Sequence, residues 1–214
     1  MRDMVILGHS MGGIISNAQI RSSGNRIYDA YFTKDLSQLD LSKEQENNIK
    51  SYGYFKANPD IDRAILLAAP LRGSAFASNR IGQFGASLIR LPFNVVDAVF
   101  GQIEVVDALT DVAQQASQRP RNSVTSLRPD NPMLGALLSC PIRSGVQVHS
   151  IVAQKDPDTP IEEGTDGFVP YTSSHLDEAV SEVVVKGADH RGMVNRDETV
   201  QEVWRILRLH AGIK

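Results

Sequence analysis

Ser10 has the neighbours that a nucleophilic serine requires. Gly8 and Gly12 stand two positions before and two positions after it. Small residues at these positions let the backbone turn sharply from a strand into a helix, which lifts the hydroxyl above the sheet edge. An apolar run over residues 4–9 predicts the strand, and a helical pattern begins directly after the serine. The spacing and its context therefore indicate a serine that attacks an electrophilic carbon.

A serine hydroxyl is a poor nucleophile until a base takes its proton, and that base needs an acid to orient it. His190 follows the last predicted strand, in a loop from which an imidazole can reach the serine, and this favours it as the base. His175 is the alternative, but it precedes that strand. The sequence thus predicts His190 as the partner of Ser10.

The other three histidines are expected to do no proton transfer. His9 adjoins Ser10 but is predicted to point to the other side of the turn, as supporting structure. His149 lies within a predicted strand, which is typical of a hydrogen-bonded core histidine. His210 ends the last predicted helix, where it would be exposed or would cap the helix.

The acid is expected in the loop that follows the third predicted strand. Five carboxylates lie in this loop: Asp156, Asp158, Glu162, Glu163 and Asp166. Most carboxylates in such a loop are solvated, so position alone leaves all five open. The cluster lacks the glycine and the terminal glutamate of a calcium-binding loop, and we expect neither a metal nor a cofactor.

Four strands must position these groups, and apolar runs predict them at residues 4–9, 61–69, 146–153 and 181–186. Helices are predicted from the serine to about Arg21, around Ser42–Tyr52 and over Arg196–His210. Strands separated by helical connections predict an α/β fold: a mostly parallel sheet with helices on both faces. The last helix is expected to pack on the sheet through apolar residues at near-helical spacing: Val200, Val203, Trp204, Leu207 and Leu209.

Residues 71–144 form a long segment between two of these strands. A helix is predicted over Ala98–Gln118, and several prolines interrupt the rest. Such an insertion fits a lid or cap, and ordinary helical packing is an equal interpretation. The chain is otherwise treated as one catalytic domain, residues 1–214.

Composition excludes several classes of protein. The net charge of -3 and the lack of a dense Lys/Arg run give no basis for nucleic-acid binding. The single cysteine, Cys140, excludes an internal disulfide and lies in an apolar stretch typical of a buried thiol. No apolar run is long enough to span a bilayer, and no leader precedes the first strand. A chain complete as given would therefore be cytoplasmic, although a targeting segment could precede it.

Three segments resemble the lipase and esterase branch of the α/β-hydrolase superfamily. Gly-His-Ser-Met-Gly-Gly at 8–13 is similar to its nucleophile turn, and 165–176 resembles the segment that supplies its acid. Residues 188–193, before a final helix, are similar to its histidine loop. The resemblance implies a Ser10, Asp166 and His190 triad and raises Asp166 above its neighbours.

A fourth segment, residues 69–74, resembles a Thr-Pro-His-Arg-Gly-Ser turn of bacterial lipase-like and PGAP-type hydrolases. It departs from that pattern with Ala69 for threonine and Leu71 for histidine.

The resemblance implies hydrolysis of a carboxylic ester, from a small molecule or a lipid, through an acyl-enzyme on Ser10. The Met11 backbone N–H would donate one hydrogen bond to the oxyanion. A thioesterase or acyltransferase with the same triad is the alternative enzyme.

In the family, the nucleophile turn follows the fifth of eight strands, whereas here it begins at residue 8. The chain is therefore expected to be the second half of such an enzyme, without the loop that holds the second oxyanion donor. Residues 4–9 would then form an apolar edge strand. This leaves a third hypothesis, an inactive remnant that acts as a binding partner.

Overall fold

The computed structural model describes residues 3–75, 106–117 and 127–213, and the chain divides into two compact units. The first, here called the sheet unit, comprises Met1–Arg21, Ala57–Phe76 and Ile142–Lys214. The second, here called the helical unit, comprises Ser22–Lys56 and Ala77–Pro141. The helical unit thus combines part of the predicted 71–144 insertion with an earlier segment, Ser22–Lys56, that contains the predicted helix around Ser42–Tyr52. Its role as a lid or cap stays a prediction.

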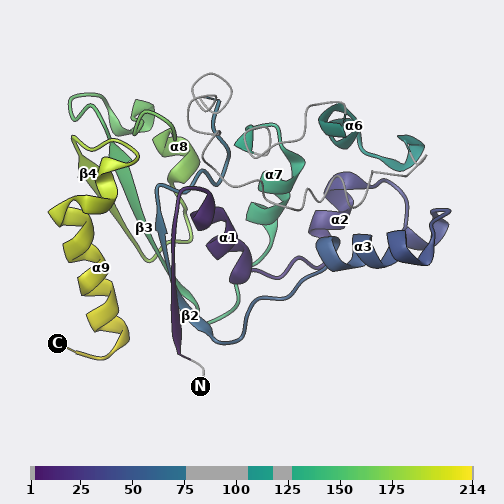
Figure 1. Ribbon diagram of the computed structural model, residues 1–214, viewed down its shortest axis with the longest axis horizontal. Helices are drawn as coiled ribbons and strands as arrows, with labels where there is room; N and C mark the ends of the chain where they lie inside the picture. Colours follow the sequence, from purple (N-terminus) through teal and green to yellow (C-terminus); the bar gives the residue numbers. More distant parts are fainter. Residues whose placement is uncertain (1–2, 76–105, 118–126, 214) are drawn as a thin grey trace. The chain divides into compact units, whose positions relative to one another are not determined.

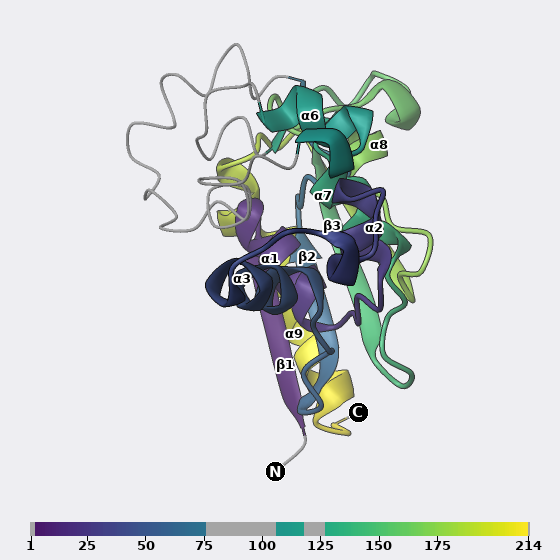
Figure 2. The same ribbon diagram turned by 90° about the vertical axis from the view of Figure 1, so that its right-hand side faces the viewer.

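The sheet unit is built on four parallel strands in the order β1-β2-β3-β4 (Figure 1). They are β1 (Met4–His9), β2 (Ile61–Leu67), β3 (Gln147–Gln154) and β4 (Ser181–Lys186). The sequence placed all four within about two residues of these bounds. Because neighbouring strands are parallel, their carboxyl ends share one edge, and the loops leaving that edge converge (Figure 2).

Helices cover both faces of this sheet, which confirms the predicted α/β fold. α1 (Met11–Gln19) packs on β1 and β2, and α9 (Asp197–His210) lies on the other side, next to β4 (Figure 1). Shorter elements lie in the connections: η4 (Ile161–Glu163), α8 (Tyr171–Ser174) and η5 (Gly192–Asn195).

The face of α9 that is buried against the sheet differs from the predicted one. Its buried side chains are Thr199, Glu202 and Ile206, and Ile206 joins Ile65, Ile151 and Val185 in an apolar cluster to which Val203 adds. The predicted contact face was largely wrong, because most of its members are exposed: Val200, Trp204, Leu207 and Leu209. α9 has two partly apolar faces, and the face that carries Glu202 packs on the sheet.

The helical unit contains α2 (Arg26–Tyr31), η1 (Leu36–Gln38), α3 (Lys43–Gly53), η2 (Val106–Ala108), α6 (Asp111–Ser117) and α7 (Pro132–Ser139). The predicted helix at Ser42–Tyr52 is confirmed as α3: the Ser42 hydroxyl caps it by accepting from the Gln45 N–H at 3.2 Å. Cys140 is fully buried, as its apolar context indicated, and its Sγ donates to the Ala136 carbonyl at 3.2 Å.

Of the predicted helix over Ala98–Gln118, residues 98–105 and 118 lie outside the described residues. The described part, residues 106–117, is not one continuous helix. η2 and α6 are separate elements here. Thr110 breaks the helix because its hydroxyl donates to the Ala30 carbonyl at 2.9 Å and accepts from the Ala113 N–H at 3.2 Å. The threonine thereby starts α6 as a new helix. Among the helices that the structure describes, none has the length and apolarity needed to cross a bilayer.

Candidate active site

Ser10 occupies a strained turn between β1 and α1. Its φ is 56° and its ψ is -128°, a combination that costs a residue with a side chain about 1–3 kcal/mol. The Ser10 N–H donates to the Leu67 carbonyl at 2.9 Å, which extends the pairing of β1 with β2 by one residue. The hydroxyl therefore stands at the carboxyl edge of the sheet, as the spacing predicted.

The glycines of the turn have unequal steric roles. A Cβ on Gly8 would lie 2.4 Å from the Gly12 carbonyl oxygen, and a Cβ on Gly13 would lie 2.4 Å from the Ala69 Cβ. A Cβ on Gly12 would meet no atom within 4 Å. Close packing of α1 against the strands thus depends on Gly8 and Gly13, whereas Gly12 has free space.

The structure brings the three predicted site residues into one hydrogen-bonded relay. His190 Nε2 lies 2.8 Å from Ser10 Oγ, and His190 Nδ1 lies 2.6 Å from Asp166 Oδ2. His190 and Asp166 are 4% and 1% exposed, so water does not compete for these bonds. With the carboxylate accepting from Nδ1–H, the imidazole presents its basic Nε2 lone pair to the serine.

A tight turn after β3 holds the Asp166 carboxylate. Its Oδ1 accepts from the Phe168 and Val169 N–H groups at 2.8 and 2.7 Å, which leaves Oδ2 for the histidine. Gly167 has a φ of +95°, a conformation that side chains rarely adopt, so the turn needs glycine there. The other loop carboxylates that the sequence left open are all exposed: Asp156, Asp158, Glu162 and Glu163.

Of the remaining histidines, His149 is the buried core residue that the sequence predicted, at 1% exposed. His175 Nδ1 lies 3.0 Å from Glu182 Oε2, and this carboxylate raises the pKa of His175. His210 ends α9, half-buried, where its Nε2 lies 2.9 Å from Asp3 Oδ1. Each of these two histidines thus bonds a carboxylate other than Asp166.

His9 contacts His190, whereas the sequence led us to expect that it points to the other side of the turn, as supporting structure. Its Nε2–H donates to the His190 carbonyl at 2.9 Å, and the two ring centroids are 4.8 Å apart. His9 is the last residue of β1 and pairs with Leu67, and from there its side chain reaches the loop that follows β4.

The turn that follows β2 is bonded to the segment that carries the acid. The Ser74 hydroxyl donates to the Phe168 carbonyl, two residues after Asp166, and the Arg72 N–H donates to Ser173 Oγ at 3.2 Å. Ser74 and Ser173 are both buried. The motif at 69–74 thus supports the acid loop, a role that the sequence did not assign.

Met11 is the first residue of α1, so its backbone N–H belongs to the first helical turn, whose N–H groups have no acceptor within the helix. This is the N–H for which the sequence predicted a hydrogen bond to the oxyanion, and that role stays a prediction.

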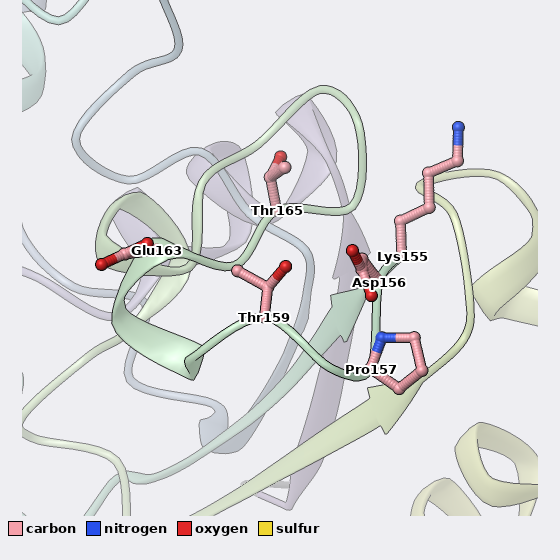
Figure 3. A pocket seen from close by; sticks show the side chains of 6 residues that line it. All are labelled: Lys155, Asp156, Pro157, Thr159, Glu163 and Thr165. Carbon is pink, nitrogen blue, oxygen red and sulfur yellow. The ribbon is translucent and has the colours of Figure 1, made fainter.

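A cavity of about 350 Å³ lies beside the acid loop, beyond the end of β3 (Figure 3). Its lining residues are Lys155, Asp156, Pro157, Thr159, Glu163 and Thr165. Thr165 Oγ1 also accepts from the Gly167 N–H at 3.0 Å, so one wall of the cavity is the back of the turn that holds Asp166. In the part of the chain that the structure describes, no three His, Cys, Asp or Glu side chains are grouped to hold a metal ion.

No protein-family model and no curated protein sequence matches the chain. Among solved structures, it is similar to Bacillus licheniformis lipase BlEst2 in mature form, with 14% identity and a TM-score of 0.47, over 96% of this chain and 66% of that one. It is also similar to Staphylococcus hyicus lipase, with 9% identity and a TM-score of 0.49, over 98% of this chain and 69% of that one. The chain thus spans about two thirds of the length of these solved proteins.

Proposed function

We propose that this chain carries the site of a carboxylic-ester hydrolase that works through an acyl-enzyme on Ser10. The observation that carries the proposal is the unbroken relay from Ser10 Oγ through the His190 imidazole to Asp166, with distances of 2.8 and 2.6 Å. Both distances are within hydrogen-bond reach, which supports proton transfer from the hydroxyl to the imidazole.

In the first half of the reaction, His190 Nε2 takes the Ser10 proton as Oγ attacks the ester carbonyl. Negative charge develops on the carbonyl oxygen, where the Met11 N–H donates a hydrogen bond. His190 then gives its proton to the departing alcohol, and the acyl group stays on Ser10. Asp166 remains ionised and stabilises the imidazolium that forms between these transfers.

In the second half, water replaces the alcohol. His190 takes a proton from water as the water attacks the acyl-enzyme, and it then returns the proton to Ser10 Oγ as the carboxylic acid leaves. The strained serine is held in place throughout by the Leu67 carbonyl and by the close packing of Gly8 and Gly13.

A fluorophosphonate probe tests the proposal, because it reacts with serines that a base has activated. Wild-type protein should be labelled and should hydrolyse p-nitrophenyl butyrate, and Ser10→Ala should lose both, with turnover falling by about 10⁴–10⁶-fold. Ser51→Ala, which changes an exposed serine on α3, is the matched control and should behave as wild type. Labelling or turnover that survives in Ser10→Ala would disprove the assignment.

Two outcomes would favour the alternatives. A folded wild-type protein that the probe does not label would indicate an inactive site. Faster turnover of acyl thioesters than of matched oxygen esters would indicate a thioesterase with the same triad.

A further inference from the structure

The histidine that precedes the nucleophile has a contact that the proposed chemistry does not use. His9 Nε2–H donates to the backbone carbonyl of His190 at 2.9 Å, and its ring centroid lies 4.8 Å from that of His190. A carbonyl only accepts hydrogen bonds, so the His9 tautomer is set: Nε2 carries the proton.

We propose that His9 is a positioning residue that holds the loop of the base in register with the nucleophile. This inference rests on the proposed function, since positioning has value only if His190 serves Ser10. His9 is the last residue of β1 and immediately precedes Ser10. Its hydrogen bond therefore ties the loop after β4 directly to the turn that carries the serine.

The contacts of the His190 backbone show why this tie matters. The His190 N–H donates to the Asp166 carbonyl at 3.0 Å, which fixes the base relative to the acid. The carbonyl of the same residue accepts from His9, which fixes it relative to the nucleophile. The His190 N–H thus bonds the residue that carries the acid, and the His190 carbonyl bonds the residue next to the nucleophile.

The rest of the loop is bonded to other parts of the unit. Asp189 Oδ1 accepts from the Gly192 N–H at 2.6 Å and closes the loop on itself, and the Gly187 N–H donates to the Gln154 carbonyl at 2.8 Å. These bonds join the loop to η5 and to the end of β3, and neither of them involves the turn that carries Ser10. The contact from His9 is made at the catalytic residue itself.

A histidine suits this position because it can donate without a charge. Burial, and then the charge of the nearby His190, lower the pKa of His9, so it is neutral at neutral pH. A lysine or arginine donor would place a fixed positive charge beside the imidazolium that forms during catalysis and would oppose it. The neutral donor fixes the base without that cost.

The test compares two variants at this position. His9→Phe keeps an aromatic ring and removes the donor, whereas His9→Gln restores an N–H at about the reach of Nε2. We expect His9→Phe to lower kcat by about 10–100-fold with little change in KM, because a small displacement of the base weakens each proton transfer. His9→Gln should recover most of the loss, and His210→Phe, the same change at the end of α9, should retain wild-type kcat.

A second measurement does not depend on turnover. The His190 Nδ1 proton, in a short bond to Asp166, should give a far-downfield proton NMR signal that is sharp in wild type and broadened in His9→Phe. Equal signals in the two proteins, or a loss of kcat that only follows the fraction of folded protein, would overturn the inference.

The two proposals fail in different ways. If the probe does not label the wild type, the proposed function fails, and the NMR signal still decides whether His9 positions the base. If the wild type is labelled through Ser10 and His9→Phe is labelled at the same rate, only the positioning role is wrong.

Discussion

Two buried histidines lie on the same sheet, one toward each end of its strands. His190 follows β4 at the carboxyl edge, and His149 is the third residue of β3, in its amino-terminal half. They are 4% and 1% exposed, and each has a hydrogen-bond partner on both ring nitrogens. By burial and bonding alone, the two are equivalent.

Their partners differ in charge, and this separates their chemistry. His190 has the Asp166 carboxylate behind Nδ1, which stabilises a proton on the opposite nitrogen. His149 Nε2 accepts from Arg63 Nη1 at 2.6 Å, and its Nδ1–H donates to Ser181 Oγ at 2.7 Å. Burial and the Arg63 charge lower the pKa of His149 to about 4. Ser181 thus accepts a hydrogen bond from a ring N–H, whereas Ser10 faces the ring nitrogen opposite the one that bonds a carboxylate.

Removing the negative charge of Asp166 should have the largest effect. Asp166→Asn keeps the shape of the turn but removes the charge and favours the wrong tautomer, so kcat should fall by about 10⁴-fold. Turnover of p-nitrophenyl butyrate measures it, and Asp156→Asn, on an exposed carboxylate of the same loop, is the matched control. If Asp166→Asn retained a tenth of wild-type kcat, a different acid would have to be sought.

Acid should lower the stability of the fold through His149, in the amino-terminal half of β3. The folded-state pKa of His149, about 4, lies below its unfolded value of 6.5, so the unfolded chain binds the proton more tightly. The contribution of neutral His149 is complete above pH 6.5 and is lost as the pH falls toward 4, by up to about 3 kcal/mol.

Chemical denaturation of wild type and His149→Gln at pH 7, 5.5 and 4.5 measures this loss. The difference between the two proteins isolates His149, because both keep His175. The pKa of His175 is raised, so its contribution to stability changes with pH in the opposite direction. If both proteins lost stability equally as the pH fell, the account of His149 would be wrong.

The smallest expected effect concerns which face of α9 packs on the sheet. Trp204 is 62% exposed, so Trp204→Gln should change the free energy of unfolding by less than about 0.5 kcal/mol. Ile206 is fully buried, and Ile206→Ala should cost about 2–5 kcal/mol. Denaturant titration of both variants gives the two values, and the reverse order would restore the face that the sequence predicted.

The sequence predicted the sheet unit well because its signals there are local. Short apolar runs ending in glycine or proline define the strands, and parallel pairing brings their following loops to one edge. Ser10 and His190 could thus be placed from the order of the elements. Asp166 could not, because five carboxylates share its loop, and what separates them is the pair of N–H groups that bind its Oδ1.

Two failures have physical causes that sequence periodicity does not carry. α9 has apolar residues on two faces, and the buried one packs Ile206 against Ile65, Ile151 and Val185 of the strands. Glu202 is the buried acid of that region, and it bonds Arg205 at 2.7 Å. His9 was misplaced because its partner is the backbone carbonyl of His190, 181 residues away in the sequence.

The φ of 56° at Ser10 has a consequence for how such a site can be lost. Glycine adopts this conformation without the side-chain clash, so the fold itself would be better served by glycine at residue 10. Selection for stability and selection for activity therefore oppose each other at this position. If the proposed reaction were no longer needed, glycine at this position would relieve the backbone strain and would lose only the hydrogen bond from Ser10 Oγ to His190.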